Sequence, residues 1–405
     1  MDELKGDAGA DAEVATIPVN IVTGFLGSGK TTMLRHVLSD PAFSRAAVLI
    51  NEFGEIGLDH LLVERLDQST MLMESGCICC TLQDDLRTTL RDLHSRRGRG
   101  EVPPFDRIII ETTGLADPAP VMATVMADPM LRHHLRVGNV VTTVDAVNGI
   151  TSFERFEQSR KQVALADRVL LTKSDLANED QCADVEARID ELNPHVRIER
   201  TVRGAAAADV LTGLGGTNTP ERDAELCGWL ATAASYRARL RGGGQGDTGV
   251  ARRAAFQATS VSPSTALHSL VMTLDEPIEW TSFGLWLSLL VQRHGEKILR
   301  FKGLLNIAGS ETPVMLHGVH ALLHPPEHLE SWPTEARNCL LVFIIQELAP
   351  ELVERSLRAF LAAGARISSS EAEYSSSMLN RPALPEAPLL RGWGDDEQDD
   401  GQVLA

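Results

Sequence analysis

The chain has 405 residues, 43% of them hydrophobic, which suffices for two domains with a sizeable core. Asp and Glu total 56 against 38 Lys and Arg, so the formal charge is −18. This acidity disfavours binding to phosphate backbones or anionic membranes, and we expect neither a nucleic-acid partner nor a membrane partner. The acidic first residues do not resemble a signal peptide, and no apolar run is long enough to span a membrane. We therefore expect a cytoplasmic protein with reduced thiols.

Short apolar runs alternate with helical patterns in the first half of the chain. Runs of this kind are typical of buried strands in a parallel sheet with helices on both faces. We predict an α/β domain over residues 16–211, preceded by a disordered leader at 1–15. The predicted strands are 17–22, 46–50, 107–110, 139–144 and 168–171, and the predicted helices include 31–38, 82–93 and 180–192.

The composition and the predicted elements change in the second half of the chain. Residues 212–262 are rich in Gly and Thr and predict a flexible linker around one helical stretch at 224–240. A small α+β domain is expected over 263–365, and an acidic, disordered tail over 366–405. The predicted strands of this second domain are 268–274, 297–305, 313–318 and 339–346, and the predicted helices are 283–293 and 350–361.

A phosphate-binding motif follows the first predicted strand. Residues 24–31 read Gly-Phe-Leu-Gly-Ser-Gly-Lys-Thr and fit G-x-x-x-x-G-K-[ST]. The glycines let backbone N–H groups curl around phosphates, and the helix N-terminus adds partial positive charge. Lys30 can reach the β- and γ-phosphates, and the Thr31 hydroxyl can bind Mg²⁺. The alternative, a glycine-rich turn that binds nothing, does not account for the complete motif in its strand–helix setting.

The third predicted strand is followed by a carboxylate that could help to bind the metal. Glu111 lies where an acidic residue of the Walker B type is expected, at the carboxyl edge of the sheet. It is also our candidate for the residue that positions the hydrolytic water. Gly114 could bring a backbone N–H close to the γ-phosphate. The alternative is an exposed glutamate at a strand end.

The segment Thr172-Lys173-Ser174-Asp175 follows another predicted strand and suits guanine. A carboxylate such as Asp175 accepts both donors of the guanine edge, whereas adenine offers an acceptor there. The methylenes of Lys173 could cover the base while its ammonium group stays solvated. An ordinary strand-to-helix loop is the alternative.

Three of the six cysteines, Cys77, Cys79 and Cys80, lie within four residues. Thiolates are high-affinity ligands for Zn²⁺ and similar ions, and so short a loop leaves a coordination position open. Buried inert thiols, or a disulfide between Cys79 and Cys80, are the alternatives. Glu52 and Glu55 lie in an acidic segment after the second strand and could bind Mg²⁺ or complete the thiolate site, or simply be solvated.

Together these motifs resemble the CobW-type GTPases. The resemblance covers about residues 16–361 and includes residues 23–32, 51–55, 76–80, 111–114, 172–175 and 192–194, with 299–303 and 317–320 in the second domain. Two features depart from the family pattern: Thr172 stands for the usual Asn, and a histidine-rich run between the domains is missing. We expect structural or surface roles for most of the clustered histidines His317, His320, His324 and His328.

The resemblance implies a metallochaperone that hydrolyses GTP to GDP and delivers Zn²⁺, or else Co²⁺, to a client apo-metalloprotein. It implies phosphate binding by Gly27, Ser28, Gly29, Lys30, Thr31 and Thr32, guanine binding by Lys173 and Asp175, and cargo binding by Cys77, Cys79 and Cys80. Gly24, Gly114 and Thr172 complete our candidate nucleotide-binding residues. A homodimer is left open. The alternatives are a nucleotide-gated metal sensor or buffer, a metallocentre activator for cobalamin synthesis or nitrile hydratase, and an ATP-dependent P-loop kinase.

Overall fold

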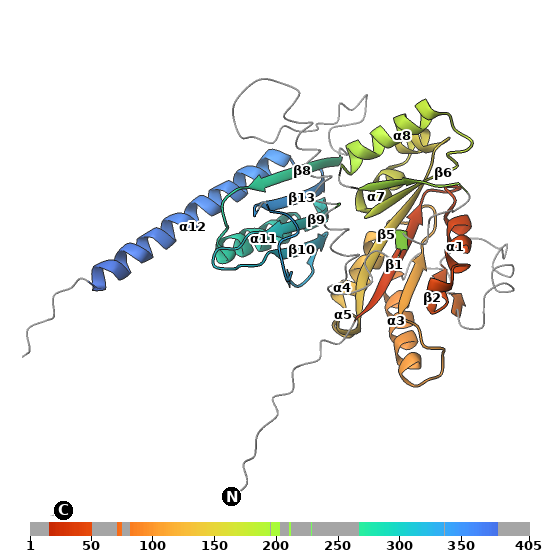
Figure 1. Ribbon diagram of the computed structural model, residues 1–405, viewed down its shortest axis with the longest axis horizontal. Helices are drawn as coiled ribbons and strands as arrows, with labels where there is room; N and C mark the ends of the chain where they lie inside the picture. The colour runs from red at the N-terminus through yellow and green to blue at the C-terminus, as the bar shows by residue number, and fades with distance from the viewer. Residues whose placement is uncertain are drawn as a thin grey trace, which may run out of the picture. The chain divides into compact units, whose positions relative to one another are not determined.

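The computed structural model describes residues 16–50, 71–74, 82–194, 196–202, 210–211, 228, 267–335 and 337–379. These residues form two sheets, both in the compact unit that ends at Leu361 (Figure 1). The predicted leader, almost all of the predicted linker with its helical stretch, and the chain from 380 onward lie outside the described residues.

The first sheet has seven parallel strands in the order β3-β2-β4-β1-β5-β6-β7. Every residue of β1 is buried, as a parallel sheet covered on both faces requires. The prediction of an α/β fold is confirmed. The strands are β1 (Ile17–Gly24), β2 (Ala46–Ile50), β3 (Met71–Glu74), β4 (Arg107–Glu111), β5 (Leu135–Asp145), β6 (Arg168–Thr172) and β7 (Arg197–Arg200).

Helices cover both faces of this sheet. Met33 and Leu34 of α1 pack with Val22 on one face. On the other face, helices including α3, α4 and α7 pack against residues such as Ile21. The helices are α1 (Lys30–Leu38), α3 (Leu82–Gly98), α4 (Ala119–Ala127), α5 (Pro129–His134), α6 (Gly149–Arg155), α7 (Glu157–Leu165) and α8 (Glu179–Leu192).

A bulge interrupts the pairing of β1 with β5. Val19 pairs with Val137, but Ile21 pairs with Val140, so residues 138 and 139 both lie opposite Asn20. The Asn20 side-chain oxygen accepts a hydrogen bond from the Asn139 N–H at 2.9 Å. The bulge thus has a specific polar partner in the centre of the sheet.

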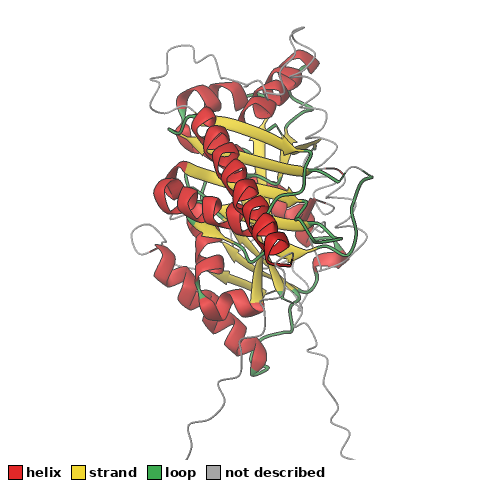
Figure 2. Ribbon diagram, turned by 90° about the vertical axis from the view of Figure 1, so that its left-hand side faces the viewer, coloured by secondary structure: helices red, strands yellow, loops and turns green. Residues whose placement is uncertain are grey.

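The second sheet is antiparallel, with its strands in the order β11-β10-β9-β13-β8, and β12 also pairs with β10. Helices cross its strands on one face (Figure 2), where Trp286 of α11 and Leu357 of α12 join the same apolar core. Its elements are β8 (Leu267–Leu274), α11 (Trp280–His294), β9 (Ile298–Leu305), β10 (Val314–Val319), β11 (Leu322–Leu323), β12 (Glu327–His328), β13 (Cys339–Gln346) and α12 (Pro350–Leu379).

The sequence predicted the small α+β unit but placed the end of its last helix too early. We expected that helix to end at residue 361, whereas α12 continues to Leu379. No helix among the described residues combines the length and the apolar character needed to cross a membrane.

The other face of the antiparallel sheet packs against the first domain. Leu299, Val319 and Ile344 belong to the same apolar cluster as Met122 of α4 and Leu165 of α7. Because the two sheets share this cluster, α4 and α7 lie between them. A displacement of either helix therefore affects both sheets.

Candidate nucleotide-binding site

The phosphate loop (residues 24–32) begins where β1 ends. Gly24 has φ 142°, and a Cβ at this position would lie 2.3 Å from Thr143 Oγ1, so only glycine fits. The turn is closed by the Ser28 N–H, which donates to the Phe25 carbonyl at 3.1 Å. The Ser28 and Thr143 hydroxyls lie 2.6 Å apart. Strand β5 therefore supports the phosphate loop through this contact.

The first residues of α1 carry the side chains that are predicted to bind phosphate and metal. Lys30 Nζ donates to the carbonyls of Gly24 at 2.9 Å and Phe25 at 3.3 Å, so its ammonium group lies within the loop. Thr31 and Thr32 follow in the first turn of the helix. This is the arrangement of a strand–loop–helix that receives phosphate at a helix N-terminus.

Glu111 and Thr31 meet across 80 residues of sequence. The Thr31 hydroxyl donates to Glu111 Oε1 at 3.1 Å, and Glu111 is only 6% exposed. Glu111 ends β4, which lies beside β1 in the sheet. A hydroxyl and a carboxylate are the hard oxygen donors that Mg²⁺ prefers, so these residues fit the metal.

The loop after β4 (residues 112–118) lies directly on the phosphate loop. A Cβ on Gly114 would be 2.6 Å from the Leu26 side chain and 2.7 Å from its backbone nitrogen. Gly114 therefore lies against the phosphate loop, and its contact with a γ-phosphate stays a prediction. The Thr112 hydroxyl also donates to Thr23 Oγ1 at 2.8 Å, which ties this loop to the end of β1.

Gln162 of α7 holds this loop from the other side and was not predicted. Its amide nitrogen donates to the carbonyls of Gly114 at 3.2 Å and Ala116 at 2.9 Å, and the residue is fully buried. Nothing in the local sequence marks it, because its partners lie more than forty residues away. A buried glutamine on a helix becomes visible as a site residue only after the fold is known.

The predicted guanine segment packs against the phosphate loop. The Thr172 hydroxyl donates to the Ser28 carbonyl at 2.7 Å and to the Val144 carbonyl at 3.1 Å. Threonine thus ties the segment to the phosphate loop through its hydroxyl. Lys173 has φ 56°, and Asp175 is exposed two residues later.

Asp145 is a further site residue that we did not predict. It accepts from Lys173 Nζ at 2.7 Å and from Asn148 Nδ2 at 3.0 Å. Burial alone would raise the pKa of Asp145, but these donors and two backbone N–H groups lower it below its usual value. The available signal was its position, directly after a predicted strand, which is the same signal that marked Glu111.

A cavity of about 260 Å³ opens beside the phosphate loop. It lies between the ends of β1 and β5 and is lined by Ser28, Thr143, Asp145, Gln162 and Lys173, among others. Ligands of open α/β sheets bind at this edge, at the carboxyl ends of the strands. The described site residues therefore converge on the expected edge.

The predicted cargo residues, Cys77, Cys79 and Cys80, and the acidic residues Glu52 and Glu55 lie outside the described residues. The chain enters both segments from the site edge of the sheet. Ile50 at the end of β2 pairs with Glu111 on one side and with Glu74 on the other. Within the described ranges, no group of three His, Cys, Asp or Glu residues could hold a metal ion.

Two of the clustered histidines and two cysteines of the described residues are partly or fully buried. His317 and His324 are partly buried, and their rings meet edge to face at 6.2 Å. Cys182 and Cys339 are buried free thiols, and burial raises the pKa of Cys339 to about 11. Such a thiol is inert at neutral pH.

The fold and the site define a P-loop nucleotide-binding protein. Residues 18–200 match the family model described as the CobW/HypB/UreG nucleotide-binding domain. Residues 267–361 match the cobalamin synthesis protein cobW C-terminal domain. The chain belongs to the CobW family of P-loop GTPases, and the predicted resemblance is confirmed.

Relatives match over nearly their whole length. The chain is 32% identical over 390 residues to the zinc chaperone CobW of Pseudomonas aeruginosa, covering 86% of this chain and 92% of that protein. It is 29% identical over 346 residues to the zinc chaperone YjiA of Escherichia coli, covering 85% and 98%. The crystal structure of the Zn(II)-bound YjiA GTPase from E. coli superposes with a TM-score of 0.59 at 25% identity, covering 85% of this chain and 99% of that one.

Proposed function

We propose that this protein is a cytoplasmic, GTP-hydrolysing metallochaperone that carries zinc and delivers it to a client apo-metalloprotein. The observation that carries the proposal is the junction at Glu111. This carboxylate accepts from Thr31 of the phosphate loop and pairs in register with Ile50, after which the acidic segment begins. The nucleotide site and the predicted cargo segments thus start from one edge of the sheet.

The chemistry at the nucleotide would depend on positioning and charge. Lys30 and the backbone N–H groups of the phosphate loop hold the phosphates, and Thr31 and Glu111 would hold Mg²⁺, which neutralises charge on the phosphate oxygens. Glu111 is also our candidate for positioning the attacking water. Asp175 accepts the two guanine donors, and Lys173 covers the base.

Cargo binding is assigned to Cys77, Cys79 and Cys80, with Glu52 and Glu55 as further ligands. The names of the relatives, zinc chaperones, support zinc as the cargo. In a nucleotide-gated cycle, GTP orders the segments that begin after Ile50 and Glu74, and hydrolysis releases them for delivery. If GTP tightens zinc binding, zinc must tighten GTP binding by the same factor.

The test is zinc affinity measured by chelator competition in the presence of GDP and of a slowly hydrolysed GTP analogue. We expect roughly a 5- to 150-fold difference. Replacing Cys77, Cys79 and Cys80 with Ser should abolish both the site and the difference while leaving zinc-free GTP binding unchanged. Cys339→Ser is the matched control, because that thiol is buried in β13 of the second sheet.

Equal zinc affinities in the two nucleotide states would contradict gating. Transfer is tested separately, by loading the protein with zinc and GTP and adding a candidate apo-enzyme. Zinc that reaches the enzyme no faster with hydrolysable GTP than with the analogue would contradict delivery and favour a metal sensor or buffer.

A further inference from the structure

Helix α7 holds the loop after β4 by hydrogen bonds to main-chain carbonyl groups of the loop. Both partners of Gln162 Nε2 are carbonyl oxygens, of Gly114 and Ala116, so only the amide NH₂ can serve them. Gln162 is fully buried, so loss of either bond leaves a polar group unpaired in the core. The loop therefore cannot change its path without moving α7 or losing these bonds.

The same helix touches the phosphate loop at its other end. Phe156, which immediately precedes α7, stacks on Phe25 with ring centroids 4.6 Å apart. Phe25 lies at the start of the phosphate loop. α7 is thus in contact with both loops that would surround the terminal phosphate.

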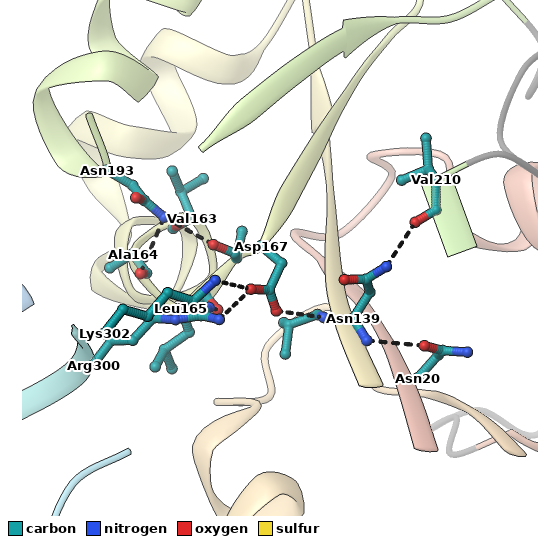
Figure 3. A network of polar contacts seen from close by, with 12 residues as sticks. Asn20, Asn139, Val163, Ala164, Leu165, Asp167, Asn193, Val210, Arg300 and Lys302 are labelled. Carbon is teal, nitrogen blue, oxygen red and sulfur yellow. Dashed lines mark hydrogen bonds and ion pairs between the residues drawn. The ribbon is translucent and has the colours of Figure 1, made fainter. Parts of the chain in front are cut away.

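The C-terminal end of α7 is joined to the second sheet. Arg300 of β9 donates both to the carbonyl of Leu165, the last residue of α7, and to Asp167. Lys302 Nζ donates to the same carboxylate at 2.5 Å, as Figure 3 shows. The Asp167 side chain is 7% exposed and that of Arg300 10% exposed.

A second contact joins the start of α7 to the sheet. Gln346 Nε2 at the end of β13 donates to Glu157 Oε1 at 2.9 Å. The same sheet thus contacts both ends of α7, so a displacement of the helix is transmitted to that sheet through closely packed neighbours.

We propose that α7 couples the nucleotide state to the C-terminal sheet, with Gln162 as a positioning residue for the loop after β4. The inference rests on the proposed GTP binding. Contact of the Gly114 backbone with the γ-phosphate shifts the loop, Gln162 passes the shift to α7, and Arg300 and Lys302 pass it to β9. In the reverse direction, the position of the C-terminal sheet sets how well the loop accepts a γ-phosphate.

The first experiment measures amide hydrogen exchange in β9 with GDP and with a slowly hydrolysed GTP analogue. The unmodified protein should show a nucleotide-dependent difference in β9 and in residues 112–118. Measured at saturating nucleotide, Gln162→Leu should lose the difference in β9. Asn193→Leu is the matched control: Asn193 donates to Val163, Ala164 and Ala166 carbonyls at the end of α7 but not to the loop.

The second experiment uses the reciprocal direction and a milder variant. Gln346→Leu removes the partly buried donor to Glu157, and Gln346 itself belongs to β13 of the second sheet. By linkage it should change the ratio of GTP-analogue to GDP affinity by roughly 5-fold. An unchanged ratio in Gln346→Leu, together with a β9 difference that persists in Gln162→Leu, overturns the coupling.

The outcomes separate this inference from the proposed function. A protein that binds GTP and changes exchange at 112–118 but not in β9 contradicts the coupling and leaves the GTPase assignment intact. A protein that does not bind GTP contradicts the proposed function itself. If Asn193→Leu also loses the β9 difference, general loosening of α7 is responsible and not the loss of Gln162. That result would overturn the positioning role of Gln162.

Discussion

The two sheets keep their buried charges in different places. In the parallel sheet, Glu111 and Asp145 end their strands, at the edge where a ligand can reach them. In the antiparallel sheet, Arg300 and Lys302 lie in the interior of β9 and are paired with Asp167. The first set lies at the edge of the proposed nucleotide site and the second joins the two sheets, so we expect the two sets to respond differently to mutation.

The largest effect should come from breaking the charge cluster between the sheets. Asp167→Asn leaves Arg300 and Lys302 facing a neutral group, and we expect the free energy of unfolding to fall by about 3–5 kcal/mol. Urea unfolding measures this change in the free energy of unfolding. Asp106→Asn is the control: its carboxylate, about half exposed, pairs with Arg45 at 3.6 Å and with Arg107 at 3.1 Å, and loss of these surface pairs should cost about 1 kcal/mol or less. Equal effects would show that burial does not distinguish the two pairs.

At the carboxyl edge of the parallel sheet, a substitution should affect activity much more than stability. Lys30→Ala should lower the rate of GTP hydrolysis roughly 100- to 1000-fold, because it removes a preorganised donor to phosphate charge. The free energy of unfolding should change by less than about 1 kcal/mol. Phosphate release and urea unfolding test both parts. Hydrolysis at the parental rate would contradict the phosphate-loop assignment.

Base selection should be affected less. Asp175→Asn places a donor where guanine needs an acceptor and should cost about 1.5–3 kcal/mol, or roughly 10- to 100-fold in GTP affinity. Titration with GTP and with ATP measures the change. Undiminished GTP affinity with continued exclusion of ATP would remove Asp175 from base recognition.

The smallest effect should appear as a pH dependence at the antiparallel sheet. Burial, followed by the charge of Lys302, lowers the pKa of His317 well below its ordinary value of about 6.5. Below pH 6.5 the unfolded chain binds this proton and the folded protein does not, so stability falls as the pH falls. The contribution is at most about 1.4 kcal/mol per pH unit.

His317→Asn should flatten this slope between pH 6.5 and 5, measured by urea unfolding at each pH. His328→Asn is the control, because that side chain is exposed. An identical slope in the His317 variant and in the parent would contradict the role of this histidine.

Local patterns were sufficient to predict the core of the fold, and they supplied candidate site residues that the structure brings to one edge of the sheet. The buried run of β1, the phosphate loop and Glu111 are each encoded by a few adjacent residues, and the structure brings them together. Helices α4 to α7 were not among the predicted elements, and the two shortest, α5 and α6, have only six and seven residues. α5, for instance, depends on Asp128, whose side chain accepts from the N–H groups of Met130 and Leu131. β7 escaped because its residues, Arg-Ile-Glu-Arg, are partly exposed at the sheet edge.

Contacts between distant segments could not be predicted. Arg300 and Asp167 are 133 residues apart, and each looks like an ordinary surface charge in its own segment. The role of Gln162 likewise depends on two carbonyls of a remote loop. Such pairs are set by tertiary packing, which leaves no period or motif in one sequence.

The bulge in β5 bears on how this chain can vary in length. Val137 and Val140 are three residues apart, yet both pack on the same face of the sheet, because residues 138 and 139 share one position opposite Asn20. A relative that lacks one of these two residues would still pair Gly24 with Thr143. A deletion between 140 and 142 would instead turn Val144 toward Ser28 and direct the threonine hydroxyl away from it. Single-residue gaps in β5 are therefore expected at 138–139, where evolution can lengthen or shorten the strand without disturbing the phosphate loop.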